Sequence, residues 1–150
     1  MVLRRIPFDS RRGQEVLLVL YALMDLGGIH GRQEVVDHIS GKRWYEIIAE
    51  DLVPTRTSRE ARYRIDLAWA RKDSVLAEYV NNLERNAWEL NRLGREVIDR
   101  VFAKFRSGEW DIGRCEYLTL EFKQVAVPGY QIKPGDRKRL SCGDPLSDYI

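Results

Sequence analysis

The segment from Arg56 to Lys72 is strongly basic, and basic side chains bind phosphate groups. It contains six basic residues and two acidic ones, Glu60 and Asp66. Lysine and arginine neutralise nucleic-acid phosphates, and arginine also pairs with the edge of a guanine base. The whole chain of 150 residues carries a net charge of only +2. Binding to nucleic acid would therefore depend on this local patch and not on overall attraction.

A second pattern is typical of metal-dependent hydrolysis. Asp111, Glu121 and Lys123 resemble the Asp…Glu-x-Lys arrangement of restriction-type nucleases, in which carboxylates hold Mg²⁺ and the lysine helps to activate water. Only about forty residues follow the last predicted helix of the N-terminal part, which is too few for the multistranded core of such an enzyme. We therefore expect no catalytic residues, and a small Mg-dependent nuclease is the least favoured alternative.

No other motif indicates a metal or a cofactor. His30 and His38 are eight positions apart and have no third ligand at helical or hairpin spacing. Cys115 and Cys142 also lack metal-ligand spacing, and two free thiols fit a reducing compartment. The apolar run 16–24 is too short to cross a membrane, and the N-terminus does not resemble a signal peptide. We expect a cytoplasmic protein without a cofactor, associated with the nucleoid if it binds DNA.

The basic segment is expected to lie on a helix spanning 58–76, capped by Ser58. At about 100° per residue, one face is apolar and is predicted to be buried. That face comprises Ala61, Ile65, Ala68, Trp69 and Leu76. The opposite face and its flanks carry the residues predicted to contact duplex DNA, which are Arg56, Arg59, Arg62, Tyr63 and Arg64.

The elements around this helix predict an α+β fold of the winged helix-turn-helix class. Helices are expected at 14–26, 32–39, 44–52 and 92–105, and Gly41 is expected to end the second. Strands 76–80 and 87–90 would form a wing around a polar turn. Arg85 in this turn is expected to contact phosphates, as are Arg4 and Arg5 in a basic N-terminal arm, residues 1–12.

The remaining residues are expected to form a β extension. Residues 116–127 alternate with period two and are rich in β-forming residues, which predicts a strand; Pro128 and Gly129 would turn the chain into a short return strand. The chain is thus divided into the arm, a winged-helix domain at 13–106, and a C-terminal β extension and tail at 107–150.

Three segments resemble the N-terminal winged-helix domain of Mrr-type restriction-system proteins. They are Trp69-Ala70-Arg71, Ala77-Glu78-Tyr79-Val80 and Trp88-Glu89-Leu90-Asn91-Arg92-Leu93-Gly94-Arg95. The spacing of the two tryptophans matches the family pattern. Glu78 stands where the family prefers glycine, and Asn91 where it prefers threonine; asparagine is also a good helix N-cap. The resemblance covers about residues 13–105 and implies a DNA-binding module, either a small regulator or a restriction-related accessory protein.

The main alternative is a winged helix that binds protein. The near-neutral net charge and the acidic Glu84 in the turn favour this reading. Helix 92–105 has apolar residues at three-four spacing, which fits either core packing or a helix pair across a homodimer. Helix 14–26 is the second candidate for a homodimer contact.

Overall fold

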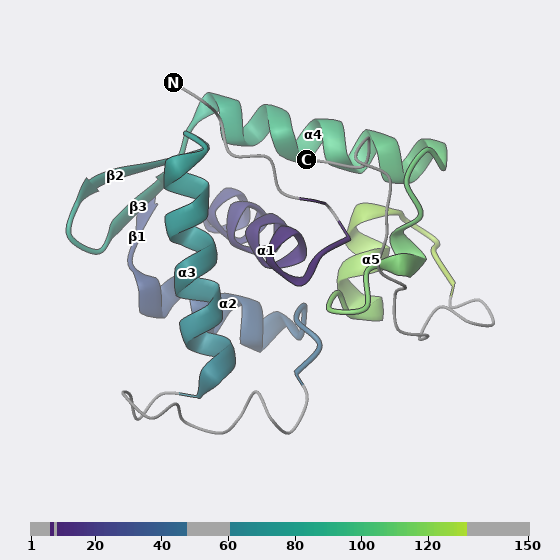
Figure 1. Ribbon diagram of the computed structural model, residues 1–150, viewed down its shortest axis with the longest axis horizontal. Helices are drawn as coiled ribbons and strands as arrows, with labels where there is room; N and C mark the ends of the chain where they lie inside the picture. Colours follow the sequence, from purple (N-terminus) through teal and green to yellow (C-terminus); the bar gives the residue numbers. More distant parts are fainter. Residues whose placement is uncertain (1–6, 8, 48–60, 132–150) are drawn as a thin grey trace.

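The computed structural model describes residues 7, 9–47 and 61–131. This part of the chain contains five α-helices, one 3₁₀ helix and a small sheet, and Figure 1 shows how they are arranged. In order, the elements are α1 (Arg11–Leu26), β1 (Ile29–His30), α2 (Arg32–Lys42), α3 (Arg62–Leu76), β2 (Val80–Glu84), β3 (Ala87–Leu90), α4 (Arg92–Ser107), η2 (Ile112–Arg114) and α5 (Leu120–Ala126). The protein is therefore of the α+β class.

Helix α1 is the central element, and the other helices surround it (Figure 1). It begins where the Ser10 side chain accepts a hydrogen bond from the backbone N–H of Gly13, which satisfies one of the free donors of the first turn. It ends at Gly27, whose φ of 71° favours a residue without a Cβ. Ten of the eleven residues from 13 to 23 are buried, as the wide apolar stripe of this segment predicts.

The sheet is antiparallel and has the strand order β1-β3-β2. Ile29 pairs with Glu89 and Val80 pairs with Leu90, and the β2–β3 hairpin has an irregular register between Asn82 and Glu84. Asn91 caps α4 directly after the hairpin, because its side chain accepts a hydrogen bond from the N–H of Gly94; this confirms the expected cap. The order of elements and the sheet topology are compatible with a winged-helix-like layout.

The predicted C-terminal strand 116–127 is wrong, because most of it is the helix α5. Thr119 caps this helix by accepting from the N–H of Phe122, and Phe122 is fully buried against the rings of Trp44, Tyr21 and Phe102. Strand character is limited to one bridge between Tyr45 and Leu118. Residues 110–126 thus contribute to the main core and are not a β extension of it. Of the predicted return strand, residues 130 and 131 are not in a strand, and the rest lies outside the described residues.

Other predicted element boundaries also differ from the structure. The predicted strand 76–80 is placed too early, because α3 continues to Leu76, the chain turns at residues 77 and 78, and β2 spans Val80–Glu84. Helix α2 continues through Gly41 to Lys42 and ends with Arg43 in the left-handed conformation. Residues 44–47 of the predicted helix 44–52 are not helical, because the backbone of Trp44 and Glu46 bonds to the segment around Tyr117; residues 48–52 lie outside the described part. Helix α3 begins at Arg62, and the predicted cap Ser58 also lies outside it.

The apolar faces of α4 and α1 are covered within this chain. On α4, the side chains of Val97, Ile98, Val101, Phe102 and Phe105 are all buried, and α4 contacts α1 and α5. The three-four spacing of α4 is therefore used for the core, and neither helix presents the apolar seam that the homodimer alternative needs. Among the described residues, no helix is long and apolar enough to cross a membrane.

Candidate nucleic-acid interface

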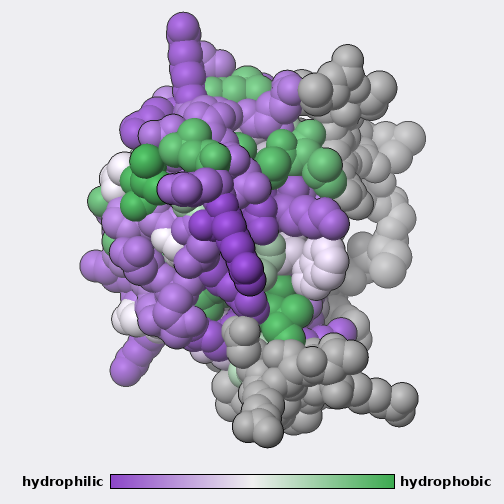
Figure 2. Space-filling model, turned by 90° about the vertical axis from the view of Figure 1, so that its left-hand side faces the viewer, coloured by the Kyte–Doolittle hydropathy of each residue, from purple (hydrophilic) through white to green (hydrophobic). Residues whose placement is uncertain are grey.

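The outer side of α3 carries both charged and apolar side chains at the surface. It combines exposed cations, Arg62 and Lys72, with two large apolar side chains that remain about half exposed. Trp69 is 51% exposed and Leu76 is 49% exposed. Figure 2 shows the side of the molecule on which α3 and the hairpin lie, with hydrophobic patches between hydrophilic side chains. Such a mixed surface fits a binding function better than a purely solvated face does.

The prediction of which face of α3 is buried was wrong. The buried residues of α3 are Tyr63, Leu67, Ala70, Asp73 and Ser74, whereas Trp69 and Leu76 are about half exposed. Alanine and serine allow α3 to approach α1 closely, and the phenol of Tyr63 remains bonded, with its oxygen 3.1 Å from the Ser40 hydroxyl. Because the inner face of α3 carries small and polar residues, the hydrophobicity pattern does not identify it as the buried face.

Some of the predicted DNA-contacting residues are exposed, and others are buried or paired with a carboxylate. Arg62 and Arg85 are exposed, on α3 and in the hairpin turn. Arg64 is turned toward α2, where its Nη2 atom lies 2.9 Å from the carboxylate of Asp37. Tyr63 is buried, so its side chain is not placed to contact duplex DNA. The other four predicted residues, Arg4, Arg5, Arg56 and Arg59, lie outside the described residues.

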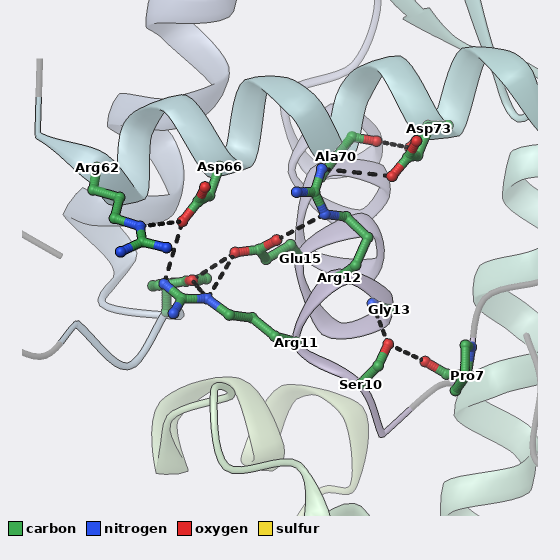
Figure 3. A network of polar contacts seen from close by, with 12 residues as sticks. Pro7, Ser10, Arg11, Arg12, Gly13, Glu15, Arg62, Asp66, Ala70 and Asp73 are labelled. Atoms are coloured by element: carbon green, nitrogen blue, oxygen red, sulfur yellow. Dashed lines mark hydrogen bonds and ion pairs between the residues drawn. The ribbon is translucent and has the colours of Figure 1, made fainter. Parts of the chain in front are cut away.

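Two arginines expected in a basic arm instead belong to a polar network at the start of α1 (Figure 3). Nε of Arg11 donates to the carboxylate of Glu15 at 3.2 Å, and Nε of Arg12 lies 3.2 Å from its other oxygen. Arg11 and Arg12 also reach across to α3, where they pair with Asp66 and Asp73 respectively. These cations hold α3 against α1, and carboxylates neutralise them.

Glu15 and Tyr45 form the buried centre of this network. The hydroxyl of Tyr45 donates to Glu15 at 2.7 Å. Burial raises the pKa of Glu15, while the hydrogen bond from Tyr45 and the charges of Arg12 and Arg11 act in the opposite direction. Burial and the charge of Glu15 raise the pKa of Tyr45, so its hydroxyl stays protonated and donates. The network has the properties of a structural anchor, since each polar group has a partner.

A second cationic group lies where α3 meets the hairpin and the start of α2. The guanidinium of Arg71 lies 4.9 Å from the ring centre of Trp88, and burial and the nearby charge of Arg32 lower its pKa. Arg71 and Lys72 were counted among the basic residues of segment 56–72 but were not predicted to contact DNA. A sequence signal for Lys72 was present, because residues three positions apart on a helix, such as Trp69 and Lys72, are neighbours. The ammonium group of Lys72 lies 4.9 Å from the centre of the Trp69 ring.

The residues of the nuclease-like pattern, Asp111, Glu121 and Lys123, do not lie on one face of a strand. Glu121 and Lys123 lie on α5, where Glu121 is exposed and Lys123 is buried. Asp111 caps the 3₁₀ helix by accepting from the N–H of Gly113. Within the described ranges, no group of three histidine, cysteine or acidic residues is placed to hold a metal ion. Cys115 is fully buried, and burial raises the pKa of its thiol, which keeps it in the unreactive protonated form.

Comparison of the chain with protein-family models, with curated proteins and with solved structures finds no match.

Proposed function

We propose that this chain is a winged-helix protein that binds duplex DNA through the outer side of α3. The observation that carries the proposal is the placement of α3. It precedes the hairpin in an α1-β1-α2-α3-β2-β3 order, and its exposed side carries Arg62 and Lys72. The major groove of DNA is wide enough to admit one α-helix. In this arrangement the hairpin would lie beside the same DNA, where Arg85 contacts a phosphate. The resemblance to the Mrr-type winged helix supports the same conclusion.

The chemistry of the α3 surface supports contact with both phosphates and bases. Lys72 and Arg62 supply positive charge, and Arg62 is only loosely held, since its Nε lies 3.9 Å from Asp66 and its side chain is 57% exposed. An exposed ion pair of this kind contributes little energy and is readily exchanged for a phosphate. Trp69 offers an apolar surface of the kind that packs on thymine methyl groups or sugars.

The test is a fluorescence-anisotropy titration of a random-sequence duplex at two salt concentrations. The expected result is binding that weakens steeply with salt, because cations are released from the phosphates. Lys72→Glu and Arg62→Glu should each reduce affinity strongly while leaving the far-UV circular dichroism spectrum unchanged. Arg100→Glu is the matched control, since Arg100 is an exposed arginine on α4. Equal losses in all three variants, or no binding by the wild type at low salt, would refute the proposal.

A second candidate is a protein-binding surface, and the exposed apolar side chains favour it. Besides Trp69 and Leu76, Leu83 in the hairpin and Ile29 in β1 are 55% and 51% exposed. Aromatic and aliphatic residues at a solvent-facing surface are typical anchors of interfaces. For a second copy of this chain, sedimentation velocity at increasing concentration would show self-association that persists at high salt and is lost in Leu83→Ser. A monomer at every concentration would remove this form of the alternative.

A further inference from the structure

A pocket of about 450 Å³ lies between α1, α4 and α5. This volume is within the range of small-molecule sites, which is roughly 300–1,000 Å³. No residue of α3 or of the hairpin lines the pocket, and Figure 1 shows α5 on the other side of α1 from α3. The pocket is therefore separate from the surface proposed to bind DNA.

Much of the pocket wall is apolar. Its apolar side chains include Met24 of α1, Ile98 and Phe102 of α4, and Val125 of α5. The ring of Phe102 is held between two other rings, with its centre 5.4 Å from that of Tyr21 and 6.1 Å from that of Phe122. A fixed apolar wall favours an apolar or aromatic group, because binding removes both surfaces from water.

Arg106 supplies a positive charge to the pocket on the side of α5. Its Nε donates to the backbone oxygen of Ala126 at 2.7 Å, and its guanidinium lies 5.6 Å from the centre of the Phe102 ring. These two contacts hold the plane of the guanidinium. Among the described residues, no carboxylate forms an ion pair with Arg106. Its terminal N–H groups form a planar fork that matches the two oxygens of a carboxylate.

The hydroxyl of Tyr21 is a second donor, because Tyr21 lines the same pocket as Arg106. Burial and the charge of Asp25 raise the pKa of Tyr21, and the charge of Arg106 opposes this increase. The hydroxyl is therefore protonated at neutral pH and can donate a hydrogen bond. Within the described ranges, no group is hydrogen-bonded to it. An anion bound by Arg106 would accept this hydrogen bond.

Asp99 gives the pocket opposite charges at two positions along α4. It lines the pocket seven residues before Arg106, which is about 10 Å along a helix. A carboxylate at this position repels a second negative group on a ligand. Ala103 lies between the two charges in the sequence and also lines the pocket. Its short side chain leaves space for a ligand.

We propose that this pocket binds a small monocarboxylic acid with an aromatic body. The carboxylate pairs with the guanidinium of Arg106 and accepts the hydrogen bond of the Tyr21 hydroxyl. The aromatic body packs on Phe102 and the neighbouring apolar side chains, and Asp99 excludes ligands with a second negative charge. The proposal does not depend on DNA binding, so either proposal can fail while the other stands.

The first experiment is isothermal titration calorimetry of the full chain with phenylacetate, 3-phenylpropionate and indole-3-propionate. At least one of these acids should bind at a single site. The uncharged amide of the same acid should bind about tenfold more weakly, because it forms no charge-assisted pair with Arg106. No binding by any of the three acids up to their solubility limits, or equal affinity of acid and amide, would overturn the proposal.

The second experiment places the bound acid in the pocket by substitution. Arg106→Gln should weaken binding about tenfold, whereas Arg100→Gln, the control on the exposed surface of α4, should leave the affinity unchanged. Asp99→Asn should bind the acid at least as tightly as the wild type. Ala103→Phe should block the pocket, and because residue 103 is exposed, this variant also decides the question if Arg106→Gln does not fold. An acid that binds Ala103→Phe as tightly as the wild type would overturn the site.

Discussion

Replacing Gly94 with alanine is expected to force α4 away from the hairpin. Gly94 lies in the first turn of α4, close to the backbone of Tyr79 and the side chain of Leu90. An added Cβ would lie 2.4 Å from the backbone oxygen of Tyr79 and 2.5 Å from a methyl group of Leu90. The methyl group can move, but the Tyr79 carbonyl is fixed, because it accepts the N–H of Asn91 at 3.1 Å. Either the helix or the entrance to β2 must shift.

The size of the effect follows from three contributions. Overpacking of this kind costs about 1–3 kcal/mol, and weakening the Asn91 to Tyr79 hydrogen bond costs about 1 kcal/mol. Alanine favours a helix over glycine by about 1 kcal/mol, which offsets part of the loss. We therefore expect Gly94→Ala to lower the free energy of unfolding by about 2 kcal/mol, a large share of the stability of a small domain.

Gly41→Ala is the matched control for this measurement. Gly41 is also helical, near the end of α2, and an added Cβ would have no atom within 4 Å. The same substitution should therefore stabilise the protein there, by up to about 1 kcal/mol. Urea unfolding monitored by circular dichroism gives both free energies. The reasoning is refuted if Gly94→Ala is as stable as the wild type, or if both variants change stability in the same direction.

Three further predictions concern Glu78 before β2, Asn86 in the hairpin turn and His30 in β1. Glu78, at a position where the Mrr-type family prefers glycine, has a φ of 66°. Glu78→Gly should therefore raise the free energy of unfolding by about 0.5–1 kcal/mol in urea denaturation. Asn86→Gly should lower the free energy of unfolding, because the Asn86 side chain accepts a hydrogen bond from the backbone N–H of Arg32. The hydrogen bond to Glu34 raises the pKa of His30, burial opposes this, and the carbonyl of Gly27 adds to the increase. Both partners are acceptors, so only the protonated ring donates to both; the stabilisation should be complete below pH 6.5 and be lost as pH rises through the raised pKa. Unfolding temperatures at pH 6 and pH 8 should differ more for the wild type than for His30→Gln, and an equal difference would contradict the assignment.

Local signals in the sequence predicted several elements correctly. The wide apolar stripe placed α1 inside the core, the predicted strand 87–90 coincides with β3, and Asn91 was recognised as a cap. These features depend on interactions between residues a few positions apart, which the sequence contains directly. The same holds for α4, whose strongly one-sided apolar pattern matches its buried face.

The candidate site was harder to predict, because the fate of a charged residue depends on its partners. Arg64 pairs with Asp37 and Arg11 with Asp66, across wide gaps in the sequence. No local pattern shows which arginines are neutralised in this way.

The sequence by itself determined the approximate positions of α1, α2, β3 and α4 and the basic character of the α3 region. Only the tertiary structure decided the orientation of α3 and the form of residues 120–126. Helix α3 has Tyr63, Ala70 and Ser74 on its inner face, so its hydrophobicity is too weakly one-sided to fix its rotation. Segment 120–126 is too short to hold a conformation alone; it becomes a helix because Thr119 caps it and the core accepts Phe122. Long-range packing overrides local preference where local preference is weak.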